Sequence, residues 1–513
     1  MENNIFIIAT IFVPYAGAAL ALAVPKDMQK RYLALLASFI AWIFSIVVLI
    51  AVNEDGTQIY RLGGWEPPYG IVLVADHLSA LFGFMSATIM LGGILYAVQC
   101  KDKSITSPSF MALFLTMETG LLGAMYTGDL FTLFVFIELT VVSSVANVAI
   151  GDSRFALEAA MKYLFMSSLG SLFLLLGIAS IYVTFGTVNF ADLARQLAIS
   201  NGNEPLLTRA SAVMLLSAFL LKSSVAPFHW WQPDFHTAAP TPLSAVLSSV
   251  IVKIGIYGII RLTSLLFVAE QALIYRWLVM LGVLAIFFGG LSALRTYNGK
   301  RVLAYSTFGQ IGFILLGIGW GTPLALLAAL VYTFNHAFIK SSLLMLMGVV
   351  ASRNEEHSAD LEKVAGTGRK LHWSIGLLFF LGGMALAGLP PMNGFISKFL
   401  LLQSGLEAHE WLATSLAIGG GILTLIYMMK TWQLIFQQKP TETSAIVHAT
   451  GGDGYLAPAL LIAASLLLGI FATPLYKFAE DTVTSLDNPH KNYIEAVEPD
   501  NWRALDYQPF LGG

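Results

Sequence analysis

Six titratable side chains lie within long apolar segments of the sequence, where a charge is costly. One is an acid, Glu138 in LFTLFVFIELTVVSS, and five are bases: Lys222, Lys253, His336, Lys340 and Lys398. A charged side chain at the centre of a bilayer costs between ~3 and ~10 kcal/mol or more, so such residues mark ion or proton pathways. The sequence therefore predicts a protein that moves protons or cations across a membrane.

Glu138 and Lys222 are predicted to form an ion pair that opens and closes. Attraction to the carboxylate offsets part of the desolvation cost of both groups, and a buried lysine can release its proton, whereas an arginine would keep it. A histidine titrates near neutrality, so His336 is expected to bridge the two halves of the chain. Lys253 precedes it, and Lys398 is the expected terminal donor or acceptor. Together they predict a hydrated polar axis in the membrane plane, joined to each side by half-channels.

Each of these residues also has a purely structural interpretation. Glu138 could be a hydrogen-bonding residue inside a bundle, and Lys253 could extend its amine to the interface. His336 could be a core histidine bonded to a carbonyl group. Lys340 lies one turn beyond His336, and for it a packing or helix-end role is nearly as plausible as a relay.

A second group of polar residues lies in and near the connection PFHWWQPDFHTAAP. His229, Asp234 and His236 are expected to feed protons from the cytoplasmic side. A metal site at His229 and His236 is disfavoured because their spacing fits no standard ligand pattern. Lys162 lies one turn into its predicted helix, where extension to the interface explains it as well as a relay does.

The composition identifies a membrane protein with many crossings. Of its 513 residues 57% are hydrophobic and only 12% are charged, whereas about a quarter are charged in soluble proteins. A net charge of −3 argues against nucleic acid as a partner. The single cysteine, Cys100, excludes an internal disulfide and a cysteine-ligated cluster. No nucleotide, haem or flavin motif is present, so no cofactor is expected.

Fourteen apolar segments are long enough to span a bilayer about 30 Å thick. Asp76 and Asp129 begin two of them and are predicted to cap their helices. The segments lie at 4–24, 32–52, 76–98, 108–127, 129–150, 157–185, 208–227, 240–263, 274–294, 301–320, 322–351, 372–404, 411–436 and 455–477. The loops after odd-numbered segments carry 14 Lys and Arg residues and the others carry five. Cytoplasmic loops are rich in these residues, so both termini are predicted to lie outside.

Two parts of the chain echo each other at a nearly fixed distance in sequence. Tyr163 and Tyr332 differ by 169 positions, and Lys222 and Lys398 by 176. Each of these lysines lies beside a proline-containing element, VAP or GLPPMNG, that should interrupt its helix. A repeated unit of five helices crosses an odd number of times, so its two copies would have inverted topology. The predicted organisation is 1–107 (three helices), 108–263 and 274–436 (five-helix repeats), 455–477 (last helix) and 478–513 (polar tail).

Several stretches resemble the antiporter-like subunits of respiratory complex I and its relatives. They are GGWEPPYGIVLVADHLSAL, FVFIELTVVSS, LLKSSVAPFHWWQPDFHTAAPTPLSA, NHAFIKSSLLM and GLPPMNGFISKFLL, and the similarity covers nearly the whole chain. Within this group, GGWEPPYGI and the closing YIEAV look like the D-type component of multisubunit Mrp-type Na⁺/H⁺ antiporters. The counterpart subunit of membrane-bound hydrogenases is very similar.

The resemblance implies an all-α membrane protein of fourteen helices. It has inverted repeats of helices 4–8 and 9–13, and helices 7 and 12 are broken. The family's glutamate, three lysines and histidine fall on Glu138, Lys222, Lys253, Lys398 and His336, all intact. The implied partners are protons, Na⁺ or another monovalent cation, and other membrane subunits, in a prokaryotic plasma membrane. The chain would be a transport subunit and not an enzyme.

Two alternatives remain open. In a redox complex such as a membrane-bound hydrogenase, electron transfer on a partner would drive the same proton movement, and the accompanying subunits would decide between the two. In a passive scaffold the polar residues would only hold helices together, but small residues suffice for that. The sequence does not identify the cation, the stoichiometry or the direction of transport.

Overall fold

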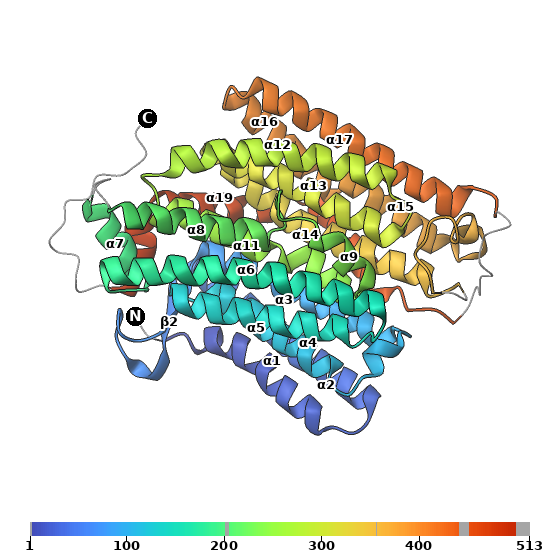
Figure 1. The fold of residues 1–513 in the computed structure, drawn as a ribbon, viewed down its shortest axis with the longest axis horizontal. Coiled ribbons are helices and arrows are strands. Elements are labelled where there is room, and N and C mark those ends of the chain that lie inside the picture. Colours follow the sequence, from blue (N-terminus) through green and yellow to red (C-terminus); the bar gives the residue numbers. More distant parts are fainter. Residues whose placement is uncertain (1–2, 201–204, 355–356, 441–450, 499–513) are drawn as a thin grey trace.

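The helices of this protein lie side by side in one elongated bundle. The computed structural model describes residues 3–200, 205–354, 357–440 and 451–498, most of which are helical. Figure 1 shows the helices running along the longest axis, with α1 (Ile5–Ala23) and α2 (Asp27–Asp55) at one edge and α16 (Asn393–Glu407) and α17 (Trp411–Trp432) at the other. The all-α membrane fold class predicted from the sequence is confirmed.

The remaining helices fill the space between these edges. They are α3 (His77–Gln99), α4 (Phe110–Tyr126), α5 (Leu130–Ala149), α6 (Arg154–Phe185), α7 (Phe190–Ser200), α8 (Leu206–Lys222), α9 (Trp231–Ala238), α10 (Thr241–Val246), α11 (Lys253–Arg261), α12 (Gln271–Arg295), α13 (Gly299–Gly319), α14 (Pro323–Ala351), α15 (Trp373–Ala387), α18 (Leu456–Ile470), α19 (Thr473–Asp487) and α20 (Glu495–Val497). The π-helical turns Leu247–Ile251 and Leu262–Leu266 join α10 and α11 into one span, Thr241–Leu266.

Ten helices within the described residues are long and apolar enough to cross a membrane, and α18 with α19 forms an eleventh if that bent pair is one span. The pair is bent by 76°, so the segment 455–477 is not one straight helix. Each of the fourteen predicted segments coincides with helical residues, but α4 and α15 are short apolar helices and α8 ends at Lys222. The number of crossings therefore stays a prediction.

Two of these segments are interrupted where the sequence places proline. α8 ends at Lys222, and Ser224 follows with a positive φ of 57° before Pro227. α15 ends at Ala387, where Gly388 adopts a left-handed conformation that glycine tolerates at a helix end, and α16 begins only after the two prolines. Both interruptions leave backbone carbonyl groups without a helical partner close to a lysine.

The centre of the bundle is formed by α14 and the span Thr241–Leu266. Both are buried on all sides along their apolar length, whereas only 33–44% of the corresponding parts of α1, α2, α5, α6, α12 and α17 are buried. A helix that is apolar all round belongs in the interior of a large bundle. Along that apolar length, the side chains of the two central helices therefore pack against protein and not against lipid.

One end of the bundle is closed by short elements. Strands β1 (Gln58–Arg61) and β2 (Val72–Ala75) form an antiparallel hairpin in which Gln58 pairs with Ala75. Residues 478–498 of the predicted polar tail are largely helical, and Thr57 donates a hydrogen bond to the Asn492 carbonyl. The rest of that tail, 499–513, lies outside the described residues.

Candidate functional site: a row of buried titratable side chains

The structure brings Glu138 and Lys222 together as the sequence predicts. The Lys222 Nζ lies 3.3 Å from Glu138 Oε1. It also donates to Ser167 Oγ at 2.6 Å and Ser171 Oγ at 3.1 Å, and the Ser171 hydroxyl donates to Glu138. The side chain of Lys222 is 5% exposed and that of Glu138 is 29% exposed. The lysine is thus held inside the bundle, while its carboxylate partner lies nearer the surface.

Sequence reasoning missed the two serines that complete this cluster. Ser167 and Ser171 lie one helical turn apart on α6, in the segment FMSSLGSLF, and therefore face the same side. That spacing was the available signal. Their hydroxyl groups give Lys222 two hydrogen-bond partners besides Glu138.

Lys253 begins α11 and is fully buried, and its amine donates to the carbonyl of Ser249 in the preceding π-helical turn. The backbone of Gly255 contacts the Phe219 carbonyl and Ser223, so a Cβ there would collide with the last turn of α8. This close approach places α11 directly against the helix that ends at Lys222. Single π-helical turns inside α-helices are frequent at functional sites.

His336 and Lys340 lie one turn apart on the central helix α14. Both ring nitrogens of His336 are buried without a hydrogen-bond partner among the described residues. Lys340 Nζ donates to the Leu303 carbonyl at 2.8 Å. His336 is close enough to interact electrostatically with Lys253, Lys340 and Lys398, and Lys340 interacts with Lys253 in the same way. Three lysine amines therefore lie within electrostatic reach of the histidine.

Lys398 lies on α16 beside the second helix break. Its amine donates to the Ala387 carbonyl at 3.0 Å, which the end of α15 leaves free, and lies 5.0 Å from the centre of the Phe313 ring. On one side it borders an apolar cavity of about 270 Å³. On the other it borders a small cavity of about 10 Å³ that it shares with His336. No acidic side chain pairs with Lys398 within the described residues.

Asp234 forms an ionic bridge between three helices. From α9 it accepts from Lys162 of α6 at 2.8 Å and from Arg301 of α13 at 2.6 Å, and Lys162 also pairs with Glu158 at 2.6 Å. Lys162 thus does not simply extend into solvent, because its amine is paired with two carboxylates. We call Lys162, Asp234 and Arg301 the Asp234 bridge.

The two histidines of the same connection are separated by their surroundings. His229 stacks on Phe308 with ring centres 4.7 Å apart. His236 is fully buried, with both ring nitrogens unpartnered among the described residues, and interacts electrostatically with Lys340 and Lys300. Within the described residues no group of three metal-ligating side chains is present.

An ion pair that sequence reasoning missed joins α3 to α11. Arg261 binds both carboxylate oxygens of Asp76, at 2.7 Å through Nη1, and also donates to Ser79 Oγ at 2.8 Å. Both partners are 3% exposed.

Asp76 also accepts from the Ser79 amide at 2.9 Å, and Asp129 accepts from that of Thr132 at 2.6 Å, which confirms the two predicted helix caps.

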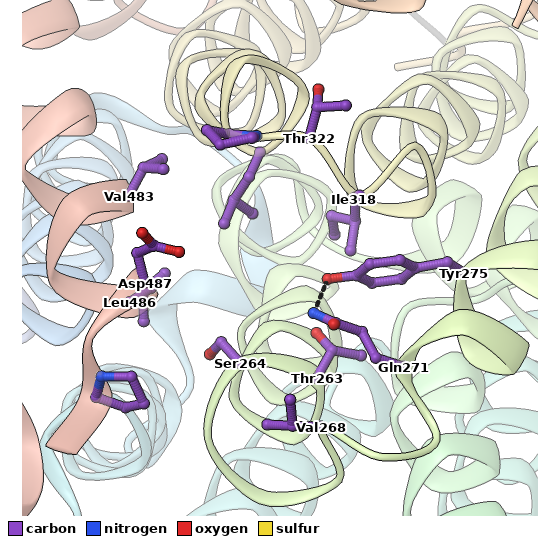
Figure 2. A pocket seen from close by; sticks show the side chains of 14 residues that line it. Thr263, Ser264, Val268, Gln271, Tyr275, Ile318, Thr322, Val483, Leu486 and Asp487 are labelled. Carbon is purple, nitrogen blue, oxygen red and sulfur yellow. Dashed lines mark hydrogen bonds between the residues drawn. The ribbon is translucent and has the colours of Figure 1, made fainter. Parts of the chain in front are cut away.

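A pocket of about 90 Å³ lies at the end of the bundle opposite the Asp234 bridge. Figure 2 shows Ser264, Gln271, Tyr275 and Asp487 around it, with Gln271 bonded to the Tyr275 hydroxyl. None of the titratable residues singled out in the sequence lines it. We call Lys222, Lys253, His336 and Lys398 the row of buried bases. This row and the pocket are therefore separate features.

The helices that carry the predicted residues follow one another across the bundle. Glu138 is on α5, Lys222 on α8, Lys253 on α11, His336 on α14 and Lys398 on α16. In Figure 1, α5 lies in the lower part of the bundle, α8, α11 and α14 in its middle and α16 in its upper part. These helices are therefore spread across the bundle, transverse to the helix axes.

Comparison with known proteins shows what the chain as a whole is similar to. Residues 127–424 match the protein family described as NADH:quinone oxidoreductase/Mrp antiporter, TM. The D-type component of a Na⁺/H⁺ antiporter from Alkalihalophilus pseudofirmus is 30% identical over 498 residues, which cover 96% of this chain and 99% of that protein.

Two solved structures share the fold along nearly the whole chain. A chain of the Mrp complex from Dietzia sp. superposes with a TM-score of 0.86 at 25% identity, covering 96% of this chain and 99% of that one. A chain of the membrane-bound sulfane sulfur reductase, an archaeal respiratory membrane complex, gives a TM-score of 0.86 at 26% identity with the same coverage.

Proposed function

Because this chain belongs to the NADH:quinone oxidoreductase/Mrp antiporter family of transmembrane subunits, we propose that it is the D-type component of an Mrp-type Na⁺/H⁺ antiporter and carries protons along its row of buried bases. It is a membrane subunit of the cation antiporter type and not an enzyme. The observation that carries the proposal is that five titratable residues lie on five helices spread across the bundle. They are Glu138 on α5, Lys222 on α8, Lys253 on α11, His336 on α14 and Lys398 on α16.

Proton movement begins at the Glu138–Lys222 pair. With the pair closed, the carboxylate and two serine hydroxyls stabilise the ammonium form of Lys222. When Glu138 withdraws, the ammonium ion is left in a low-dielectric interior, which favours release of its proton. Lys222 is the last residue of α8, so a small movement at the break changes its distance from Glu138.

Lys253 and His336 take the proton through the centre. Between α8 and α11 the hydroxyls of Ser223, Ser224 and Ser249 are buried without a partner among the described residues. Buried polar groups are normally hydrogen-bonded, and internal water serves those that lack a protein partner. We therefore assign a water-filled step between Lys222 and Lys253, and a neutral His336 accepts the proton next.

Cytoplasmic protons enter beside the Asp234 bridge. His236 lies on the same helix as Asp234, and Lys340 is in electrostatic reach of both His236 and Lys253. In this arrangement His236 and Lys340 form the branch from the cytoplasmic side to the central row. His229, packed between two aromatic rings, lies at the start of that branch.

The remaining features of the proposal follow from the family. We assign the chain to a prokaryotic plasma membrane with both termini outside, fourteen crossings and two inverted five-helix repeats. The two helix breaks, each beside a lysine, support the repeat. Other membrane subunits supply the coupling, and the transported ions are protons and Na⁺ or another monovalent cation.

A second candidate function is supported by the equally close fold match to the sulfane sulfur reductase chain. In a redox-driven complex the same row would move protons in response to electron transfer on a partner subunit.

Purification of the native complex through a tag on this chain tests the proposal. We expect only membrane subunits to co-purify, and reconstituted vesicles to exchange a monovalent cation for protons. His336→Ala should abolish that exchange in an assembled complex. Co-purifying iron–sulfur subunits would favour the redox function, and full exchange by His336→Ala would overturn the relay.

A further inference from the structure

The step between His336 and Lys398 differs from the others because a small cavity separates the two residues. The cavity has a volume of about 10 Å³ and is lined by α13, α14, the end of α15 and α16. A space of roughly 10–15 Å³ holds about one water molecule, provided that two to four polar groups face it. Gln310, Tyr332 and Ser397 line it together with His336 and Lys398.

The side-chain amide of Gln310 is held in one orientation. Tyr332 Oη donates to Gln310 Oε1 at 2.6 Å, and Gln310 Nε2 donates to Thr424 Oγ1 at 3.2 Å. The Thr424 hydroxyl donates its own hydrogen to the Gly420 carbonyl at 2.9 Å, so it can only accept from Gln310. The amide oxygen must therefore face Tyr332.

This fixed pair retains groups that can bind a water molecule. A tyrosine oxygen that donates its hydrogen keeps an acceptor site, and an amide oxygen that accepts one bond keeps a second acceptor site. Gln310 is 1% exposed and Tyr332 is 3% exposed, so bulk solvent does not compete for these sites.

The helices on the two sides of the cavity are also fixed relative to each other. Asn335 Nδ2 donates to Ser397 Oγ at 2.9 Å, and Asn393 Nδ2 donates to Asn335 Oδ1 at 3.0 Å. Asn335 precedes His336 and Ser397 precedes Lys398, so these bonds hold α14 and α16 together next to the two proton carriers. The cavity is therefore a defined space and not a loose gap.

We propose that Gln310 and Tyr332 are positioning residues that hold one water molecule between His336 and Lys398 and thereby set the rate of proton transfer between them. In the direction of the relay, the water accepts a hydrogen bond from an N–H of protonated His336, donates one hydrogen to the neutral Lys398 amine, and donates the other to Tyr332 Oη or Gln310 Oε1. A proton passes from His336 to the water as the water gives one to Lys398. His336 becomes neutral, Lys398 becomes charged, and the water is regenerated.

The test is transport by reconstituted complexes that carry Tyr332→Phe or Gln310→Met. Each removes a polar group that holds the water, and misplacement of a relay atom by about 1 Å can cost on the order of a hundredfold in rate. We expect turnover to fall about tenfold or more, the KM for the cation to stay unchanged, and the solvent isotope effect in D₂O to rise. The double variant should be no slower than the slower single variant, because the pair acts as a unit.

Tyr96→Phe is the matched control. Its hydroxyl is buried, donates a 2.6 Å hydrogen bond to Asp453, and lies against Gly348, about three helical turns beyond His336 on α14. We expect its turnover per assembled complex to stay within twofold of the wild type. An equal loss in Tyr96→Phe and Tyr332→Phe would overturn the inference, as would wild-type turnover in Gln310→Met. If Tyr332→Phe does not assemble, Gln310→Met alone decides.

This inference rests on the proposed function, but the two fail differently. If His336→Ala transports at full rate, the proposed relay fails. If His336→Ala is inactive while Tyr332→Phe and Gln310→Met match the wild type, only the positioning role fails.

Discussion

Two ion pairs of this protein, Glu138–Lys222 and Asp76–Arg261, are built for opposite purposes. Arg261 binds both oxygens of Asp76, and the aromatic rings of Tyr257 and Tyr493 each lie 5.1 Å from its guanidinium group. Both partners are enclosed. Lys222 instead makes one contact of 3.3 Å with a carboxylate that is 29% exposed.

The difference lies in whether the pair can exist in two states. Arginine keeps its proton and binds carboxylates in a fixed two-pronged geometry, so the Asp76–Arg261 pair permanently braces α3 against α11. Lysine can lose its proton, and Ser167 and Ser171 give Lys222 two hydrogen-bond partners besides the carboxylate. We call Glu138–Lys222 the loosely held pair and Asp76–Arg261 the enclosed pair. A proton relay needs the first kind, and a structural brace needs the second.

The largest effect is expected from removal of the loosely held pair. Lys222→Ala or Glu138→Ala should lower transport on the order of a hundredfold or more, because the row loses a proton carrier, while the complex still assembles. Ion flux in vesicles checks this. Lys430→Ala is the matched control, because Lys430 also donates to a helix carbonyl, at 2.9 Å from Leu294, but lies off the row. Full transport by Lys222→Ala would abolish the contrast between the two pairs.

Lys222→Arg would convert the loosely held pair into a brace. The charge and the contact with Glu138 are kept, but the proton is not released. We expect a transport loss comparable to that of the alanine variant, together with thermal stability at least equal to the wild type. Transport near the wild-type rate in this variant would show that Lys222 need not titrate.

Asp76→Asn should weaken the enclosed pair and leave transport chemistry intact. Removal of one member of a buried ion pair costs about 3–5 kcal/mol because the other charge is left uncompensated. A lower thermal unfolding midpoint and less assembled complex are expected, with unchanged transport per assembled complex. The double variant Asp76→Leu, Arg261→Met should recover part of the stability, and a transport defect that persists in it would place the enclosed pair on the proton path.

The smallest effect is expected from Ser171→Ala. The variant removes one of two hydroxyls that hold Lys222, and a single hydrogen bond to a charged group contributes about 1.5–3 kcal/mol at most. Because Ser167 and Glu138 remain, we expect a several-fold loss of transport and no loss of assembly. The variant Ser167→Ala, Ser171→Ala should lose clearly more, and equal rates in the single and double variants would remove the serines from the holding role.

The sequence was sufficient to find the loosely held pair. Glu138 and Lys222 interrupt apolar segments, and that interruption is visible without any coordinates. The enclosed pair was hidden because Asp76 and Arg261 lie at the ends of apolar segments, where charges are ordinary and suggest a cap or a loop. Only the packing of α3 against α11 joins two residues that are 185 positions apart in the chain.

Composition and the positions of charge and proline alone determined that the chain is an all-helical membrane protein with titratable groups at depth and two interrupted helices. These properties follow from the cost of exposing polar groups to lipid, which acts on each segment independently. The tertiary structure decided which groups meet: the serines beside Lys222, the Asp234 bridge, and the cavity between His336 and Lys398. Such contacts depend on the relative rotation and depth of neighbouring helices, and the apolar pattern of a fully buried helix such as α14 does not specify its rotation.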